Sequence, residues 1–368
     1  RFEHTRADIA LDLLQFVPGD EPVKVSRLRI RNLSGRTRHL TLTAYVEWVL
    51  GTSRSSTAPF VATEIDPLTG GMLARNLWGG IETRVAFTDL CGLQTAWTGN
   101  RMEFIGRNGT LERPAALAAG AKLSGRTGAG LDPCGALQTS VVLAAHASVE
   151  LVWLLGEAGT TQAAQAMIAR WRGEDMDVAL QSVRANWSTV LDTATVRTPD
   201  RAFDLMLNGW LLYQVLACRV WARSAFYQSS GAYGFRDQLQ DTMALILAQP
   251  ALAREHLLRA AGRQFLEGDV QHWWLPQTGR GVRTRVSDDR VWLGYCVAHY
   301  VETTADAGVL DERVPFLDGP ALQPGETDNS FLPTAGEPSA TLFEHCARGL
   351  DGSLAVGSHG LPLIGTGD

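Results

Sequence analysis

Apolar and polar residues alternate along much of the first 155 residues, a pattern that predicts β-strands. In residues 23–31 apolar side chains recur at every second position, and Asn32-Leu33-Ser34-Gly35 follows with turn chemistry. Residues 40–48 alternate in the same way. Further strands are expected at residues 84–87, 102–105, 140–145 and 149–155. Many short strands separated by Gly, Pro and Asn indicate an antiparallel β-sandwich, with one face of each sheet buried.

The period becomes helical near Gly156. Residues 161–172 and 175–191 read as connecting helices. Thr198-Pro199-Asp200 then predicts a helix start, because Pro disfavours helix before it and Asp200 can act as the N-cap. One apolar stripe follows at helical spacing, made of Phe203, Met206, Leu207, Trp210, Leu211, Gln214, Val215 and Cys218.

More helices are expected at residues 237–248, 251–266, 289–303 and 340–350, with Gly- and Pro-rich loops at 231–234, 274–282 and 317–336. Antiparallel helices joined alternately by short and long loops suit an α/α barrel, whose long loops gather at one end and build the site. The fold class expected is therefore α+β and multidomain. A β-sandwich would occupy residues 1–157, a helical linker 158–197 and a helical domain 198–368.

Composition narrows the classes of partner. Hydrophobic residues make up 45% and charged residues 20% of the chain, which is typical of a globular protein. The net charge of −6 argues against a nucleic-acid partner, and no apolar run is long enough for a membrane span, so no membrane contact is expected from this segment. The cysteines show neither a CxxC motif nor zinc spacing, so no metal site is expected. The 11 Trp residues could stack on sugars, although Trp is also ordinary core material.

The first polar cluster is the motif 233–241, Tyr-Gly-Phe-Arg-Asp-Gln-Leu-Gln-Asp. Arg236, Asp237, Gln240 and Asp241 fall in the first turns of a predicted helix and could point into a cavity. An arginine beside carboxylates makes a rigid array of donors and acceptors that suits sugar hydroxyls. The alternative is a helix N-terminus whose acids favour the dipole and pair with a surface arginine.

Two more clusters follow. In residues 268–274 adjacent Trp residues come after Gln271 and His272 on a predicted loop, and the alternative is that one indole belongs to the core and the His only packs. In residues 283–290 the neighbouring acids Asp288 and Asp289 would repel each other if both were ionised, so one could stay protonated and donate a proton to a glycosidic oxygen. The alternative is that Asp288 caps the helix while Asp289 pairs with an arginine.

Taken together, these strings resemble the glycoside hydrolase family 94 phosphorylases, and within them the module of cyclic β-1,2-glucan synthases and 1,2-β-oligoglucan phosphorylases. The resemblance rests on the strings at 198–200, 210–214, 227–241, 268–274, 280–292 and 360–368. It implies a supersandwich, linker helices and an (α/α)6 barrel. It also implies inverting phosphorolysis, in which inorganic phosphate is the co-substrate and attacks the anomeric carbon. No other cofactor is implied.

The resemblance also suggests roles for single residues. Asp288 would be the proton donor, with Asp289 as the fallback. Arg236 and Asp241, from the same motif as Asp237, would hold the transferred glucosyl unit. Gln271, Trp273 and Arg283 are further candidates for lining the substrate site.

The family's final Gly-x-Gly-Asp string continues into further barrel helices, whereas this sequence stops at Asp368. The resemblance thus implies a partial barrel without the family's phosphate-binding residues, with little activity on its own and an exposed apolar surface. It also implies a cytoplasmic location, with a parent that could be tethered to the inner membrane, and a homodimer for the complete protein. An inverting hydrolase on the same scaffold and a non-catalytic glucan-binding module remain alternatives.

Overall fold

The computed structural model describes residues 1–51, 53–78, 84–223 and 231–365. The chain divides into two compact units, Arg1–Asn186 and Trp187–Asp368. The division falls within helix α4 (Met176–Leu191). The domain boundaries expected after residues 157 and 197 remain predictions. Two of the predicted motifs reach outside the described residues, at 227–230 and at 366–368.

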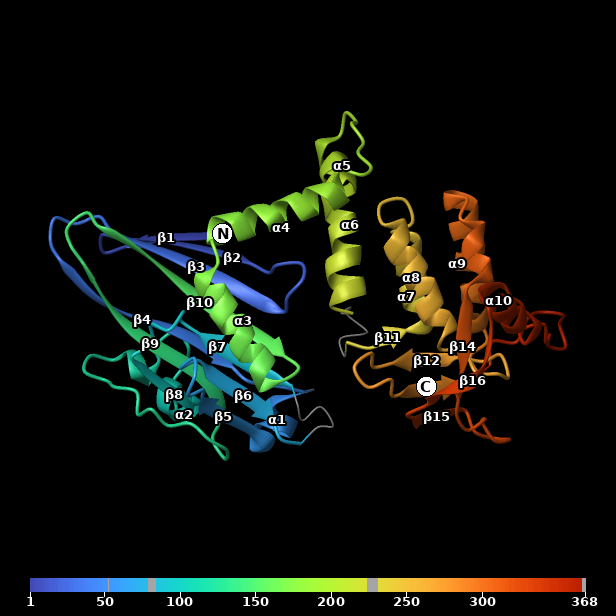
Figure 1. Cartoon of the computed structure of the whole chain (residues 1–368), viewed down its shortest axis with the longest axis horizontal. Helices are drawn as coiled ribbons and strands as arrows, with labels where there is room; N and C mark the ends of the chain where they lie inside the picture. The colour runs from blue at the N-terminus through green and yellow to red at the C-terminus, as the bar shows by residue number, and fades with distance from the viewer. Residues whose placement is uncertain (52, 79–83, 224–230, 366–368) are drawn as a thin grey trace. The chain divides into compact units, whose positions relative to one another are not determined.

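The first unit contains two antiparallel sheets (Figure 1). The larger has the strand order β1-β2-β3-β10-β7-β6-β5 and the smaller the order β4-β9-β8. Their strands are β1 (Phe2–Arg6), β2 (Ile9–Phe16), β3 (Val23–Asn32), β4 (Arg38–Glu47), β5 (Val61–Ile65), β6 (Met72–Asn76), β7 (Val85–Asp89), β8 (Ala96–Asn100), β9 (Pro133–Leu143) and β10 (Ser148–Ala158).

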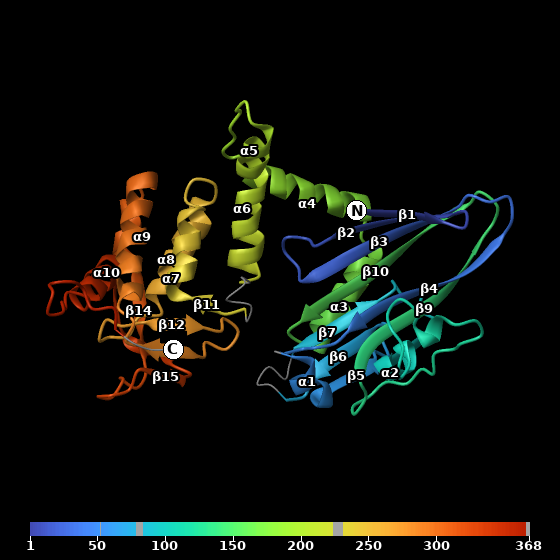
Figure 2. The ribbon, with the colours of Figure 1, turned by 180° about the vertical axis from the view of Figure 1, so that it is seen from behind.

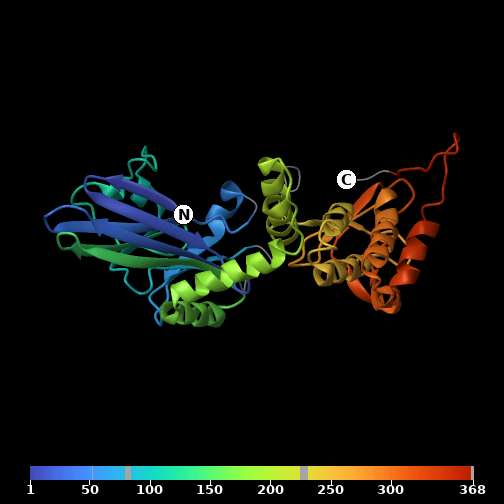
Figure 3. The same ribbon diagram turned by 90° about the horizontal axis from the view of Figure 1, so that it is seen from above.

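The alternation in β3 explains how the layers pack. Val23 and Val25 point to one face, where they join a cluster with Ile168 and Trp171 of α3 (Thr161–Gly173). Ile30 points to the other face and packs against Leu143 of β9, so the two sheets share a core there. Figure 3 shows α3 on one side of the larger sheet, where the first half of α4 also joins the core through Ala179 and Leu180. The predicted antiparallel sandwich is therefore confirmed.

One predicted strand in this unit is wrong. Residues 102–105 belong to helix α2 (Arg101–Ile105), because the Asn100 side chain accepts a hydrogen bond from the Met102 backbone N–H and caps the helix. The unit also contains helix α1 (Arg54–Thr57) and the 3-10 helices η1 (Ala58–Phe60) and η2 (Ala115–Leu117).

The second unit is mainly helical. A continuous helix runs from residue 201 to 221, and Asp200 caps it by accepting hydrogen bonds from the backbone of Ala202 and Phe203, as predicted. Its segments are α5 (Arg201–Leu205), the π-helix η3 (Met206–Trp210), α6 (Leu211–Tyr213) and the π-helix η4 (Gln214–Trp221). The helices that follow are α7 (Phe235–Met243), α8 (Pro250–Ala261), α9 (Asp288–Thr304), the 3-10 helix η5 (Ala307–Asp311) and α10 (Leu342–Asp351).

Short strands occupy three of the predicted loops. A sheet of order β11-β12-β13-β15 lies beneath α7, α8 and α9 (Figure 2), and β14 pairs with β16. The strands are β11 (Tyr233–Gly234), β12 (Gln271–Trp274), β13 (Gly281–Thr284), β14 (Arg313–Asp318), β15 (Asp328–Phe331) and β16 (Thr334–Thr341). The expectation that residues 268–274 form a loop is thus wrong for Gln271–Trp274, which pairs with strands on both sides.

The predicted apolar stripe of the long helix does not coincide with the residues that the helix buries. None of its eight members, all of which the structure describes, is fully buried, and of these only Val215 packs at the edge of a cluster. The buried residues of this helix are Leu216 and Val220, which lie outside the predicted stripe and pack with Trp187 and Leu245, so the predicted buried face is wrong. Phe203 is 50% exposed and Trp210 is 51% exposed, although both lie in the predicted stripe. Among the described residues, no helix is both long enough and apolar enough to cross a membrane.

Candidate active site

Arg236 and Asp288 meet where α7 and α9 begin. The Arg236 Nη1 atom donates a hydrogen bond of 2.8 Å to Asp288 Oδ2 across 52 residues of sequence. The two helices pack against each other through Leu239 and Cys296, whose Sγ atom lies 3.5 Å from the Leu239 carbonyl oxygen. This packing brings the first turns of both helices together, so the arginine of one predicted motif reaches the acid of another. The hydrogen bond to Asp288 raises the pKa of Arg236, against an opposing effect of burial.

The two neighbouring acids have different environments. Asp289 is 1% exposed, and its Oδ2 atom lies 2.6 Å from Nδ1 of His272 on β12. Burial raises the pKa of Asp289, and the negative charge of Asp288 raises it further. The hydrogen bond to His272 lowers this pKa but does not cancel the rise. Asp288 is half-buried; its Oδ2 atom meets Arg236, and its Oδ1 atom is itself buried, without a hydrogen-bond partner among the described residues. Asp288 therefore presents a carboxyl group beside Arg236, while Asp289 anchors the helix start to the sheet.

Asp241 does not pair with Arg236. Its Oδ2 atom accepts a hydrogen bond of 2.9 Å from Nε of Arg219 on η4. Burial raises the pKa of Asp241, and Arg219 opposes the shift. Asp237 lies closer to Arg236, with 3.9 Å between Oδ1 and Nε. Sequence analysis missed Arg219 because its partner lies 22 residues further along the chain, in another element.

Gln271 holds the hairpin of β12 and β13. It is 1% exposed, its Nε2 atom donates 3.1 Å to the Gly279 carbonyl, and its Oε1 accepts from Arg263 at 3.4 Å. Trp274 is the core indole of the tandem pair, at 1% exposure, whereas Trp273 is half-buried. The structure therefore places Gln271 within the hairpin and leaves Trp273 as the more accessible of the two predicted lining residues on β12.

Arg283 lies in a separate buried cluster. Its Nε and Nη2 atoms each donate 2.6 Å to the Asp269 carboxylate, and Nη2 donates 3.0 Å to Glu267. The guanidinium also lies 3.9 Å from the centre of the Phe265 ring, and the side chain is 1% exposed. The structure does not bring Arg283 to Asp288. A cavity of about 200 Å³ adjoins this cluster and is lined by Glu267, Asp269, Arg283, Thr284, Arg285, Arg290, Ala321 and Leu322.

The end of the described chain runs beside the acid pair. The Ser287 backbone N–H donates a hydrogen bond of 2.7 Å to the Ile364 carbonyl, and the Ser287 hydroxyl donates to Leu363. Gly365 has a φ of +81°, and a Cβ atom at this position would overlap the Arg285 carbonyl group. The motif 360–368 thus contributes backbone directly before Asp288, at a position that accepts only glycine.

An arginine and a partly exposed carboxylate at two adjoining helix starts can recognise sugar hydroxyls, which both donate and accept hydrogen bonds. None of the described residues form a group of three or more His, Cys, Asp or Glu side chains that could hold a metal ion.

Comparison with known proteins identifies the family. Residues 1–174 match the supersandwich domain of glycosyl hydrolase 94, and residues 186–368 match the catalytic domain of the glycosyl hydrolase 94 superfamily. The chain belongs to glycosyl hydrolase family 94. The resemblance predicted from the sequence is therefore confirmed, and the Arg236–Asp288 pair lies in the part that matches the family 94 catalytic domain.

Several relatives support this membership. The cyclic β-(1,2)-glucan synthase NdvB of Rhizobium meliloti (strain 1021) is 44% identical over 370 residues, which cover 100% of this chain and 13% of the relative. The solabiose phosphorylase of Paenibacillus borealis is 27% identical, covering 100% of this chain and 45% of the relative. The N,N′-diacetylchitobiose phosphorylase of Vibrio furnissii is 25% identical, and the alignment covers 94% of this chain and 45% of the relative. The chain thus spans less than half the length of each of these relatives.

A solved structure shares the fold. A bacterial glucoamylase in complex with acarbose matches with a TM-score of 0.50 at 9% identity, covering 80% of this chain and 44% of that chain. The predicted fold class, a supersandwich followed by a helical region of the barrel type, is confirmed by this match together with the two family domains.

Proposed function

We propose that this chain is part of an enzyme that cleaves β-linked gluco-oligosaccharides with inorganic phosphate and releases glucose 1-phosphate. The observation that carries the proposal is the Arg236–Asp288 pair, placed in a segment that matches the family 94 catalytic domain. The phosphorylases among the relatives support this reaction type. The 44% identity to a cyclic β-(1,2)-glucan synthase supports β-1,2-linked glucan as the substrate class.

The chemistry requires a proton for the departing sugar oxygen but no carboxylate base. Inverting hydrolysis uses a second carboxylate to activate water, whereas phosphate is already ionised at neutral pH and can attack directly. The remaining tasks for the protein are to orient the glucosyl unit, to bind phosphate and to supply the proton.

We assign Arg236 and Asp288 to the first of these tasks, the binding of the glucosyl hydroxyls. Asp288 Oδ2 accepts a hydrogen bond from Arg236, and a guanidinium beside a carboxyl group supplies the donors and acceptors that sugar hydroxyls need. Proton donation by Asp288, the role that the resemblance implies, is the untested alternative to this assignment, and it requires the sugar to displace Arg236. Asp289 is a poor candidate because its carboxyl is buried behind the helix start. Under this proposal the proton comes from a carboxyl outside the pair.

Trp273 is proposed as a further lining residue, because it is the more accessible indole of β12 and its backbone pairs with Gly234, two residues before Arg236. In this proposal Asp241 and Gln271 do not touch the sugar. Asp241 positions Arg219, and Gln271 holds the β12–β13 hairpin in place. Since phosphate and a phosphorylated sugar are metabolites of the cytoplasm, we place the reaction there.

A second candidate is a module of a larger glucan synthase. The specific observation in its favour is that the whole chain aligns with 13% of NdvB, at the highest identity among the relatives compared. In such a protein the same site would shorten or trim glucan made elsewhere in the polypeptide.

The test is phosphate dependence. The full gene product that carries these residues is incubated with linear β-1,2-gluco-oligosaccharides, with and without inorganic phosphate, and glucose 1-phosphate is measured. The proposal expects glucose 1-phosphate only when phosphate is present. Sugar release that is indifferent to phosphate would establish a hydrolase instead, and binding without turnover would establish a glucan-binding module.

A further inference from the structure

Two aromatic rings stack on the surface of the sandwich unit. Trp78 is 71% exposed and Phe60 is 38% exposed, and their ring centres lie 5.7 Å apart at an interplanar angle of 24°. Because the rings are nearly parallel, Phe60 supports one face of the indole. A large aromatic surface of this kind is costly to leave in water, and it is suited to a flat apolar partner.

The two rings are held by the edge of the larger sheet. Phe60 ends η1 directly before β5, and Trp78 follows β6, the strand that pairs with β5. The Leu77 backbone N–H donates 3.0 Å to the Phe60 carbonyl, and the Trp78 backbone N–H donates 2.9 Å to Oδ1 of Asn76. The Asn76 Nδ2 atom in turn donates 2.9 Å to the Leu50 carbonyl. The backbone at Phe60 and the backbone that leads into Trp78 are therefore held by hydrogen bonds at the sheet edge.

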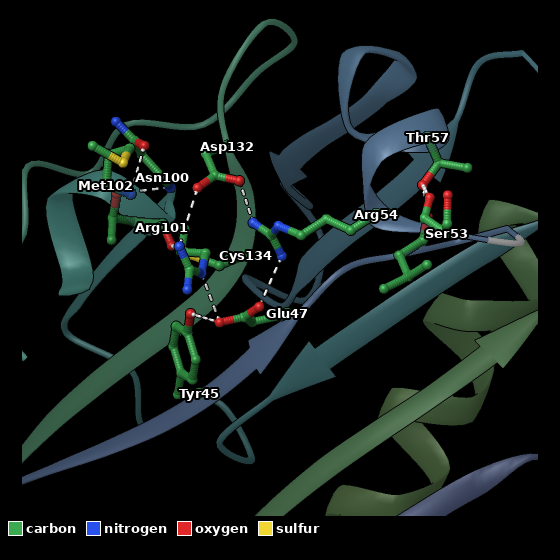
Figure 4. A network of polar contacts seen from close by, with 12 residues as sticks. Tyr45, Glu47, Ser53, Arg54, Thr57, Asn100, Arg101, Met102, Asp132 and Cys134 are labelled. Carbon is green, nitrogen blue, oxygen red and sulfur yellow. Dashed lines mark hydrogen bonds and ion pairs between the residues drawn. The ribbon is translucent and has the colours of Figure 1, made fainter. Parts of the chain in front are cut away.

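A network of charged groups fixes the segment that leads to Phe60 (Figure 4). Glu47 on β4 accepts a hydrogen bond of 2.9 Å from Nη1 of Arg54, the first residue of α1, and one of 2.7 Å from Nε of Arg101. The Asp132 carboxylate accepts a hydrogen bond from Nη2 of Arg54, and its Oδ2 atom lies 3.6 Å from Nη1 of Arg101. Two acids and two arginines thus close a ring of contacts that anchors α1. Since α1 continues directly into η1, this anchor also determines where Phe60 lies.

We propose that Phe60 and Trp78 form a platform on which a pyranose ring of the glucan stacks, at a site separate from the Arg236–Asp288 pair. This inference rests on the proposed function for the identity of the sugar, a β-linked glucan. The axial hydrogens of a β-glucosyl ring make one face of the sugar flat and apolar, which matches the open face of a supported indole. The rigidity of the platform lowers the entropy cost of binding.

The surroundings of the platform favour a sugar over a protein partner. The helix that leads into Phe60 contributes exposed hydroxyl groups from Ser55 and Ser56, and Ser53 lies exposed directly before it. Exposed hydroxyl groups on the segment that leads into an aromatic platform can add hydrogen bonds to the stacking that a sugar makes. Another exposed aromatic surface, on the helix at 201–221, is flanked by the apolar side chains of Met206, Leu207 and Leu211.

The experiment measures glucan affinity and phosphorolysis separately in the full gene product. Trp78→Ala, Trp78→Phe and a control, Leu68→Ala, are compared with the parent by electrophoresis through gels containing long linear β-1,2-glucan. Leu68 is a matched control because it is an apolar residue of the same unit and is 79% exposed. Phosphorolysis is followed with a short β-1,2-gluco-oligosaccharide, the disaccharide, whose two glucosyl units both bind where the bond between them is cleaved.

We expect Trp78→Ala to weaken affinity for the long glucan by roughly threefold to tenfold, the size of one aromatic stacking contact. Trp78→Phe should retain part of the affinity for the long glucan, and Leu68→Ala should retain all of it. The rate of phosphorolysis of the short oligosaccharide should be the same in all three variants as in the parent. Unchanged glucan affinity in Trp78→Ala, or an equal loss in Leu68→Ala, overturns the inference. If phosphorolysis is absent while glucan affinity still depends on Trp78, the proposed reaction fails and the platform stands.

Discussion

Asp288 shows how one contact limits what a carboxyl group can do. From the sequence, its position in an acid pair predicts a proton donor. In the structure its Oδ2 atom accepts a hydrogen bond from Arg236, which sequence analysis had grouped with Asp241 instead. No local sequence pattern predicts this pairing, because Arg236 and Asp288 are 52 residues apart in the sequence and meet only through the packing of α7 against α9. Residue types were therefore predictable at this site, whereas partners were not.

The role of Asp288 can be separated from proton donation by changing the leaving group. In Asp288→Asn we expect kcat/KM to fall roughly 10- to 100-fold, the size of a lost charged hydrogen bond to the sugar. The fall should be equal for a natural β-1,2-glucoside and for a glucoside with an acidic dinitrophenol leaving group, which needs no proton. Steady-state kinetics of both substrates provide the measurement. Asp237→Asn, which alters the more distant acid beside Arg236, is the control and should have a smaller effect. A loss confined to the natural substrate would make Asp288 the proton donor.

His256 gives the second unit a stability that depends on pH. Burial, together with the nearby charge of Arg259, lowers the pKa of His256 to about 3, and its Nε2 atom has no hydrogen-bond partner among the described residues. Because the unfolded chain binds this proton near pH 6.5, the stabilising contribution is complete above that pH and is lost as the pH falls toward 3.

We therefore expect the unfolding free energy of the parent to fall between pH 6.5 and 3 with an extra slope of up to about 1.4 kcal/mol per pH unit. His256→Phe should remove this part of the slope while keeping the ring contact with Tyr233. Urea unfolding of the parent and the variant at several pH values measures the slope of the unfolding free energy against pH. His299→Phe is the control for a histidine that is less buried, and a parent slope identical to that of His256→Phe would contradict the assignment.

At the scale of elements, long periodic segments were predictable and short ones were not. β3, β10 and the long helix after Asp200 were found from their periods and caps. The strands β11, β12 and β13 are two to four residues long, too short to show alternation, so they were taken for loops. Residues 102–105 resemble a strand because Phe104 and Ile105 favour β-structure, but the Asn100 side chain caps a helix here.

The Arg283 side chain connects β13 to Asp269, which precedes β12, and to the Pro320 carbonyl, which follows β14, and we predict that its role is structural. Arg283→Leu leaves the buried Asp269 carboxylate without its partner and should destabilise the second unit by about 3–5 kcal/mol. Arg280→Leu, an exposed arginine next to the same strand, should cost much less. Thermal or urea unfolding of the two variants compares them. Equal stability of both variants, with weaker oligosaccharide binding in Arg283→Leu alone, would instead support the substrate-binding role expected from the resemblance.

At the scale of the whole molecule, each unit has a core of its own, and one surface of the second unit remains apolar. Phe203, Trp210 and Leu211 are exposed along the helix at 201–221, together with Leu205 and Met206. A surface of this kind promotes association in water. An exposed apolar surface, which the sequence predicts, is thus found on the helix at 201–221.

We predict that the 368-residue chain self-associates through this helix. Replacing Phe203 and Trp210 together with Gln should shift the sedimentation profile toward smaller species at the same protein concentration. Val142→Gln, which changes a residue that is 62% exposed on β9, is the control and should leave the profile as in the parent. If both variants sediment alike, the contact surface lies elsewhere.

The close approach of Gly365 to the Arg285 carbonyl group has a consequence for how related sequences can vary. These two positions lie 80 residues apart, yet a side chain at the first would displace the backbone that leads to Asp288. A natural variant that lacks this glycine should therefore also carry a compensating change, such as a deletion or a different turn, in the segment equivalent to residues 285–287. The two segments are expected to evolve as a pair.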